Sequence, residues 1–129
     1  MSLRPFLKWV GGKRQLLPVL RRFYPEPVGR YFEPFLGSGA VFFDLTSRGR
    51  LNGRGAVLSD DNADLIACYR RIGRSVDDVI AALEGLAADH AARGRDCYLQ
   101  VRDEHFNPRR AAWRERGGDL DDYPADLAA

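Results

Sequence analysis

The spacing of hydrophobic residues in the first half of the chain predicts two short strands with a helix between them. Apolar runs at residues 31–35 and 56–58 are bounded by glycine or aspartate, as strands often are. Between them, residues 40–45 continue in helical fashion after the sequence Gly37-Ser38-Gly39. The order strand, helix, strand is typical of a parallel sheet with a right-handed crossover, so we expect an α/β fold here.

Proline and glycine punctuate the segments around these strands. The sequence FLKWVGG at residues 6–12 predicts an ordered loop that leads into a short helix, with Pro18 in its first turn. Pro25 and Pro27 are predicted to end that helix. Residues 52–55 predict a turn before the second strand.

The second half of the chain contains only helical patterns. Apolar residues recur at helical spacing from Leu65 to Ile72, and Gly73 is predicted to end this helix. Ser75 is predicted to cap a second helix that ends at Gly94. Five apolar side chains share one face of it: Val76, Val79, Ile80, Leu83 and Leu86.

A third helix is predicted around Tyr98, ended by Asn107-Pro108. A short charged helix or loop follows at residues 109–116, and a further helix is predicted after Pro124. The two cysteines of the chain, Cys68 and Cys97, have neither metal-ligand spacing nor the density of a secreted scaffold. We expect buried thiols, with no disulfide and no metal site.

The composition is that of a water-soluble globular domain. The chain has 129 residues, of which 45% are hydrophobic and 29% charged, which argues against disorder and against a coiled coil. No apolar run approaches the roughly 18 residues that span a bilayer, and the N-terminus lacks the apolar region of a signal peptide. We therefore expect a cytoplasmic protein.

Positive charge is concentrated at the N-terminal end. The net charge is +2, but the first 30 residues carry seven basic groups and one acid, Glu26. Lys8 and Lys13 are the only lysines, against 18 arginines. This choice favours a role at these positions that needs a compact ammonium rather than a guanidinium. Such asymmetry fits a polyanionic partner, and it also fits a solvated helix face.

The glycine loop after the first predicted strand is suited to close approach by a ligand. Gly37 and Gly39 allow a tight turn, whereas Phe42 stands where a dinucleotide fingerprint has glycine. Asp60 follows the second strand, where a carboxylate can accept hydrogen bonds from both hydroxyls of an adenosine ribose. A helix N-cap is the alternative role for Asp60, and Asp61 could fill either role.

A second glycine pair precedes Lys13. The segment differs from a phosphate-binding P-loop, which has glycine at the position of Leu7 and serine or threonine at that of Arg14. Trp9 and Lys13 can instead place an aromatic face and an ammonium against one small ligand. A core tryptophan and a surface lysine are the alternative.

Three blocks of sequence together resemble the N-terminal half of a DNA adenine methyltransferase of the Dam family. They read FLKWVGGK at residues 6–13, FEPFLGSGAVF at residues 32–42 and SDDNADLI at residues 59–66. The helices that follow resemble the start of the family's target-recognition domain. The resemblance implies an enzyme of the kind found in restriction-modification systems, which flips adenine out of duplex DNA and methylates its exocyclic amino group without a metal.

The resemblance also implies S-adenosylmethionine as the cofactor. It assigns cofactor contacts to six residues: Trp9, Lys13, Phe35, Gly37, Gly39 and Asp60. In the family the tryptophan and lysine touch the cofactor, the glycine loop packs under it, and the aspartate holds the ribose. These roles agree with those read from the residues themselves.

The family's catalytic Asp-Pro-Pro-Tyr motif is absent, because no two of the seven prolines are adjacent. We therefore interpret the chain as an N-terminal fragment, without catalytic residues and inactive alone. Residues 1–66 would form a partial Rossmann-like S-adenosylmethionine-dependent methyltransferase sheet. Residues 67–129 would form the opening helices of the target-recognition domain.

The expected partner is double-stranded DNA. A truncated gene, an incomplete sequence and a split enzyme, whose second chain carries the missing catalytic half, are three open explanations of the fragment. Candidate phosphate contacts, chosen by charge alone, are Lys8, Arg14, Arg21, Arg22, Arg109 and Arg110. A non-catalytic module that binds S-adenosylmethionine or DNA is the alternative function. An NAD-dependent oxidoreductase is disfavoured by Phe42.

Overall fold

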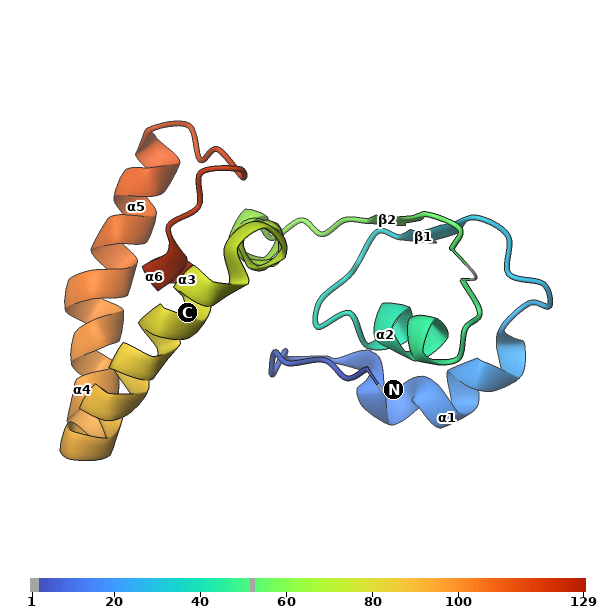
Figure 1. Cartoon of the computed structure of the whole chain (residues 1–129), viewed down its shortest axis with the longest axis horizontal. Coiled ribbons are helices and arrows are strands. Elements are labelled where there is room, and N and C mark those ends of the chain that lie inside the picture. Colours follow the sequence, from blue (N-terminus) through green and yellow to red (C-terminus); the bar gives the residue numbers. More distant parts are fainter. Residues whose placement is uncertain (1–2, 52) are drawn as a thin grey trace. The chain divides into compact units, whose positions relative to one another are not determined.

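The computed structural model describes residues 3–51 and 53–129, which form two compact units (Figure 1). One unit ends at Asp61, and the other comprises Asn62–Ala129. Asn52, the first residue of the predicted turn, lies outside the described residues. None of the described helices is long and apolar enough to cross a membrane.

The first unit contains the predicted strand, helix and strand. Its elements are the 3-10 turn η1 (Lys13–Leu16), α1 (Leu17–Leu20), the 3-10 turn η2 (Arg21–Phe23), β1 (Tyr31–Glu33), α2 (Ala40–Ser47) and β2 (Ala56–Leu58). The two strands pair in parallel, with Phe32 opposite Val57. The α/β organisation and the parallel pairing are confirmed.

The first strand is shorter than predicted because it ends before a proline. Pro34 has no backbone N–H and cannot continue the ladder from its own nitrogen. One further backbone hydrogen bond joins the two chain segments after Pro34. The Leu36 amide donates to the Ser59 carbonyl, with 3.0 Å between nitrogen and oxygen. The loop that follows β1 is therefore held against the residues that follow β2.

One face of the small sheet is covered and the other is open. Helix α2 lies beside the two strands (Figure 1), and the core contains Val28, Leu45 and Leu51, all buried. On the strands, Phe32 and Val57 are 56% and 57% exposed. Parallel sheets are normally covered on both faces, whereas the residues of the first unit cover only the face toward α2.

Asp44, a buried residue of α2, fastens the N-terminal helical segment to the unit. Arg21 donates to both carboxylate oxygens, with the shortest contact, from Nη2 to Oδ1, at 2.6 Å, and Arg48 donates from one turn later. The Tyr24 hydroxyl also donates, at 3.3 Å. The hydrogen bonds from Arg21, reinforced by Arg48, hold the pKa of Asp44 below its ordinary value despite its burial.

The second unit begins with a long helix, α3 (Ala63–Arg93), whose N-cap is Asn62. The Asn62 side chain accepts a hydrogen bond from the Leu65 amide at 3.1 Å. The alternative role of Asp60 as a helix cap is therefore wrong. Ser75 is the one non-helical residue within α3, with φ −150° and ψ 62°, so a kink there divides two helical stretches, as the prediction of Ser75 as the cap of a second helix requires. The predicted helix end at Gly73 lies two residues before the observed kink.

Three of the remaining helical segments follow one another without a gap: α4 (Arg95–Gln100), the π-helical segment η3 (Val101–Phe106) and α5 (Asn107–Glu115). The short α6 (Ala125–Ala128) comes after a loop and lies beside α3 (Figure 1). The predicted break at Asn107-Pro108 is wrong. Pro108 lies in the first turn of α5, where a missing N–H costs nothing, and the wider π-helical turn precedes it.

An aromatic pair lies at the centre of the second unit's core. The rings of Trp113 and Tyr123 meet edge to face with centroids 4.9 Å apart, and the indole donates to the Asp119 carbonyl. Cys68 belongs to the same core, and burial raises the pKa of its thiol. Both cysteines are buried, as predicted. Of the five apolar residues predicted to share a face of α3, Val79 is the buried one.

Candidate functional site

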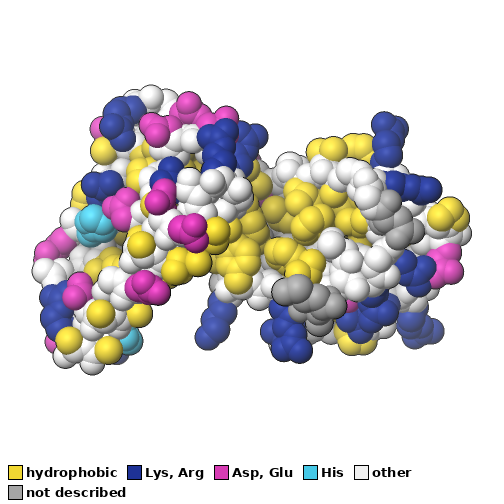
Figure 2. Space-filling view, in the orientation of Figure 1, with side chains coloured by type: hydrophobic (Ala, Val, Ile, Leu, Met, Phe, Trp, Pro, Cys, Tyr) yellow, Lys and Arg dark blue, Asp and Glu magenta, His cyan; other side chains and the backbone are white. Residues whose placement is uncertain are grey.

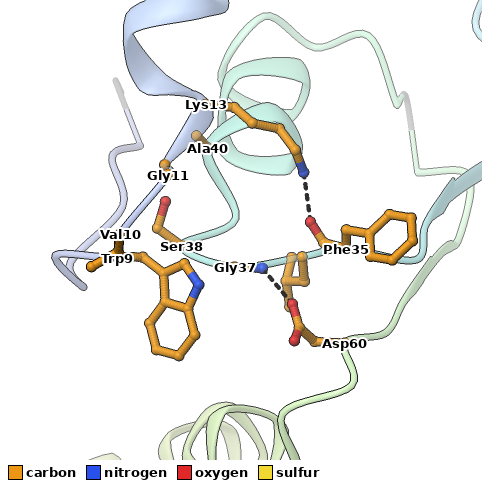
Figure 3. A pocket seen from close by; sticks show the side chains of 11 residues that line it. Trp9, Val10, Gly11, Lys13, Phe35, Gly37, Ser38, Ala40 and Asp60 are labelled. Carbon is orange, nitrogen blue, oxygen red and sulfur yellow. Dashed lines mark hydrogen bonds between the residues drawn. The ribbon is translucent and has the colours of Figure 1, made fainter.

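A pocket lies in the first unit, between the two loops that the sequence singled out (Figure 3). One wall is the segment from Trp9 to Lys13, another is the loop after β1, and Asp60 closes the site from the end of β2. Five of the six predicted cofactor residues line it: Trp9, Lys13, Phe35, Gly37 and Asp60. Gly39, the sixth, lies at the end of the same loop as the N-cap of α2.

The glycine loop brings bare backbone against the indole of Trp9. Gly37 has a φ of +52°, which favours glycine, and a Cβ added there would lie 3.0 Å from Trp9 Cδ1. Gly39 has a φ of +69°, and a Cβ there would lie 3.0 Å from the Phe43 ring. Both positions therefore require glycine. At Gly37 a side chain would collide with the Trp9 indole, and at Gly39 it would collide with Phe43 of α2.

Asp60 is tied to the glycine loop. Its Oδ2 accepts a hydrogen bond from the Gly37 amide, with 2.9 Å between the two atoms (Figure 3). Both residues follow the carboxyl ends of parallel strands, the edge at which α/β sheets bind their ligands. Asp60 and the glycine loop thus lie at the same edge of the sheet. Asp61, the neighbouring acid, is exposed and does not line the pocket.

The second glycine pair shapes the opposite wall. The Gly12 amide donates to the Trp9 carbonyl at 3.1 Å, which closes a tight turn, and Gly11 has a φ of +73°. A Cβ on Gly12 would lie 3.0 Å from that same carbonyl oxygen. The turn allows Trp9 and Lys13 to face one pocket from positions close in sequence.

The Lys13 side chain extends from the Trp9 turn to the residues at the end of β1. Its Nζ donates to the Phe35 carbonyl at 2.5 Å and to Oε1 of Glu33 at 3.1 Å. Glu33 is 5% exposed, which makes it a buried charge with one direct counter-ion. Lys13 is therefore a partly exposed lysine, 37% exposed, whose ammonium is anchored to β1. Trp9 is 39% exposed, so the alternative interpretation of a core tryptophan is wrong.

Glu33 and its neighbour Tyr31 were given no role by the sequence reasoning. The Tyr31 hydroxyl donates to Oε2 of Glu33 at 2.8 Å. Burial, followed by this hydrogen bond, raises the pKa of Tyr31, so the phenol stays protonated and acts as a donor. The available signal was an acid within the aromatic run YFEPF, where an apolar residue would be expected.

Ser38 was also missed. It stands between the two loop glycines, is 5% exposed and lines the pocket. Its hydroxyl adds a polar group to the glycine loop. A small polar residue between two glycines is common in loops, so the sequence alone gave it no special weight.

The six arginines and lysines chosen as phosphate contacts differ in their surroundings. Arg21 is paired with Asp44, Arg109 with Asp126 and Arg110 with Asp64. The other three, Lys8, Arg14 and Arg22, are exposed in the first unit. Figure 2 shows basic side chains with few acidic ones over that unit in this view, and both kinds over the helical unit.

The donor set of the pocket fits a charged nucleoside. A carboxylate at a strand end suits ribose hydroxyls, an indole suits an aromatic or cationic surface, and an ammonium suits a carboxylate. Gly12 and Gly37 present bare backbone to the pocket, and a Cβ on either residue would lie 3.0 Å from an atom of Trp9. The residues present therefore fit an amino-acid-bearing nucleoside such as S-adenosylmethionine.

Comparison with known proteins yields one family. The family model described as D12 class N6 adenine-specific DNA methyltransferase matches residues 9–118. The match begins at Trp9 in the pocket and continues into the helical unit, so it includes both compact units.

Several curated relatives align with most of the chain. It is 39% identical over 102 residues to the Type II methyltransferase M1.LlaDCHI of Lactococcus lactis, covering 79% of this chain and 33% of the relative. It is 37% identical over 117 residues to the Type II methyltransferase M.MjaIII of Methanocaldococcus jannaschii, with 83% and 39% covered. A DNA adenine methylase of Haemophilus influenzae is 38% identical over 104 residues, with 81% and 34% covered. The chain thus spans between 33% and 39% of the length of these three relatives.

Proposed function

The chain belongs to the D12 class N6 adenine-specific DNA methyltransferases, and we propose that its first unit binds S-adenosylmethionine for methyl transfer to the exocyclic amino group of adenine in DNA. The observation that carries this proposal is the pocket between the Trp9 turn and the glycine loop, closed by Asp60. The family membership confirms the resemblance read from the three sequence blocks.

Each pocket residue has a role that follows from its position. Asp60 accepts hydrogen bonds from the ribose hydroxyls, as its place after β2 favours. The indole of Trp9 and the backbone of Gly37 form the wall against which the adenosine packs. The Lys13 ammonium has three donors, of which two are used by Glu33 and Phe35, and the third can bind the carboxylate of the amino-acid part.

When bound, S-adenosylmethionine supplies an activated methyl group on a sulfonium. The contribution of this chain is to bind and orient that molecule, which is the positioning part of catalysis. The acceptor amine of adenine needs a separate site, which the family forms with an Asp-Pro-Pro-Tyr motif. That motif does not occur in the 129 residues. We therefore propose that this chain alone does not transfer methyl groups.

The catalytic part would be supplied by residues outside this sequence, for example on a second chain. The relatives are roughly three times as long as the part that the chain matches. The face of the sheet that carries Phe32 and Val57 is apolar and exposed, which is suited to cover by further elements of a methyltransferase domain. The helical region, residues 67–129, would then contribute to contact with duplex DNA.

The cofactor proposal can be tested by calorimetry on the 129-residue chain. We expect micromolar binding of S-adenosylmethionine, abolished by Asp60→Ala. Asp61→Ala is the matched control, because it removes an exposed acid one residue away that does not line the pocket. The absence of binding to the unchanged chain, or equal effects of the two substitutions, would contradict the proposal.

The catalytic part of the proposal needs a different assay. Incubation of the chain with tritiated S-adenosylmethionine and adenine-containing duplex DNA should give no labelled DNA. Turnover by the chain alone would show that the acceptor site is present within these residues. Binding of the cofactor without turnover by any combination of chains would favour the alternative of a non-catalytic binding module.

A further inference from the structure

The ion pair of Lys13 and Glu33 lies at the edge of the pocket that is proposed to bind a sulfonium cofactor. Lys13 lines that pocket, and its side chain is 37% exposed. A sulfonium is a fixed positive charge, so an ammonium in the same pocket repels it. At an effective dielectric constant of about 20, two unit charges roughly 6 Å apart repel strongly enough to weaken binding by about a hundredfold.

Glu33 is placed to cancel that repulsion. Its side chain is 6% exposed, and Oε1 lies 3.1 Å from Lys13 Nζ. A buried carboxylate is poorly screened by solvent, so its charge reaches the pocket and offsets part of the repulsion, although Lys13 lines the pocket and Glu33 does not. The pair as a whole carries no net charge, although each member is ionic.

The Glu33 carboxylate is held in one orientation. It is the last residue of β1, and its second oxygen accepts the hydrogen bond from Tyr31, a residue of the same strand. Tyr31 is itself half-buried and remains a donor. The carboxylate therefore cannot turn away from Lys13 without breaking this second contact, which keeps the counter-ion beside the ammonium.

We propose that Glu33 is a positioning residue for the cofactor, which neutralises Lys13 and fixes its ammonium at the pocket edge, so that the pocket accepts a sulfonium ligand. The inference rests on the proposed function. It assigns to Glu33 no contact with the cofactor, because the side chain acts through Lys13. If Glu33 had a purely structural role and only fastened the first turn of η1 to β1, Glu33→Gln would change the affinity for charged and uncharged ligands equally.

Two ligands separate these roles. S-adenosylmethionine carries a sulfonium, whereas S-adenosylhomocysteine has an uncharged thioether and is otherwise the same apart from one methyl group. Their dissociation constants are measured by calorimetry on the 129-residue chain and on Glu33→Gln. We expect Glu33→Gln to weaken binding of S-adenosylmethionine about tenfold more than binding of S-adenosylhomocysteine.

The control removes a negative charge elsewhere in the same unit. Glu26 is 65% exposed and paired with Arg50, outside the pocket. Glu26→Gln should leave the ratio of the two dissociation constants unchanged, because an exposed charge is screened by water and salt. Circular dichroism of each variant shows whether the fold is retained.

Substitution of Lys13 should change the ratio of the two dissociation constants in the opposite direction. The test therefore remains decisive even where Glu33→Gln fails to fold. Lys13→Gln leaves the Glu33 charge uncompensated, so it should shift the ratio in favour of S-adenosylmethionine, although binding of both ligands weakens. The double variant Lys13→Gln with Glu33→Gln removes both charges and should return the ratio to that of the unchanged chain.

The outcomes distinguish this inference from the proposed function. If the unchanged chain binds neither ligand, the proposed function is wrong and the role of Glu33 falls with it. If the unchanged chain binds both ligands, but Glu33→Gln and Lys13→Gln leave the ratio unchanged, only the role of Glu33 is overturned. Cofactor binding by this pocket would then stand, with Glu33 as a structural residue.

Discussion

The carboxylate of Asp60 lies 2.9 Å from the amide nitrogen of Gly37, in a hydrogen bond that joins the ends of two parallel strands. The Leu36 amide donates to the Ser59 carbonyl immediately beside it, so the strand register places both residues. The position of the acid in the pocket is therefore set by backbone pairing as well as by its own side chain. Substitutions in the loop should disturb the acid and the pocket together.

Gly37→Ala should weaken cofactor binding. The φ of +52° is unfavourable for alanine, and the new Cβ would lie 3.0 Å from the Trp9 indole. We expect about a tenfold loss of affinity for S-adenosylhomocysteine, measured by calorimetry. Gly29→Ala is the control, because a Cβ there meets no atom within 4 Å, and its affinity should match that of the unchanged chain. Equal affinities for all three proteins would contradict the pocket geometry.

Asp44→Asn should destabilise the first unit. The substitution removes the ion pairs with Arg21 and Arg48, whose side chains are 38% and 43% exposed. Since the arginines are partly solvated, we expect a loss of about 1 kcal/mol in the free energy of unfolding. Urea unfolding followed by circular dichroism measures it. Asp78→Asn, which removes an exposed pair with Arg71, should change the free energy by less than half of this.

The contribution of Asp44 should depend on pH in one direction. Its pKa in the folded chain lies below the ordinary value of 3.8, chiefly because Arg21 donates to it. The unfolded chain thus takes up a proton first, so the stabilisation is fully present above about pH 5 and is lost as the pH falls through the folded pKa. The difference in unfolding free energy between the unchanged chain and Asp44→Asn should shrink between about pH 5 and pH 2. A difference that grows on acidification would show that Asp44 is not held as a paired carboxylate.

Much of the first unit could be predicted because its signals are local. Glycine and proline bound the strands, the second strand coincides with an apolar run of three residues, and Asp60 follows it at the position that favours a ribose contact. The pairing of Lys13 with Glu33 could not be predicted in this way. It joins residues 20 apart in the sequence, and no periodicity of the sequence records that contact.

The helical unit shows where local rules fail. Asn107-Pro108 predicts a helix end, but proline also suits a first helical turn, and which role applies depends on the preceding backbone. The π-helical segment from Val101 supplies that backbone, and its origin is not visible in the residue pattern. The kink in α3 lies at Ser75, which serine's suitability as a helix cap predicts, whereas Gly73, predicted to end the preceding helix, keeps helical geometry.

Trp113→Ala should destabilise the second unit strongly. The side chain is 3% exposed, lies against Tyr123 and donates to the Asp119 carbonyl. Loss of a buried tryptophan of this kind costs about 3–5 kcal/mol in the free energy of unfolding. Thermal and urea unfolding measure the loss, with Val76→Ala as the control, because Val76 is 46% exposed. A change of less than about 1 kcal/mol for Trp113→Ala would contradict the assignment of this residue to the core.

Contact with DNA phosphates should come from the exposed basic residues rather than from the paired ones. Arg14 and Arg22 are exposed in the first unit, whereas Arg110 is held by Asp64 at 2.8 Å. Each lost phosphate contact lowers the slope of log affinity against log salt concentration by about 1. The double variant Arg14→Ala with Arg22→Ala should therefore lower that slope by about 2 for a duplex oligonucleotide, measured by fluorescence anisotropy. Arg110→Ala should leave the slope unchanged, because that arginine already has an acidic partner. A larger effect of Arg110→Ala than of the double variant would show that pairing with an acid does not keep an arginine from contacting phosphates.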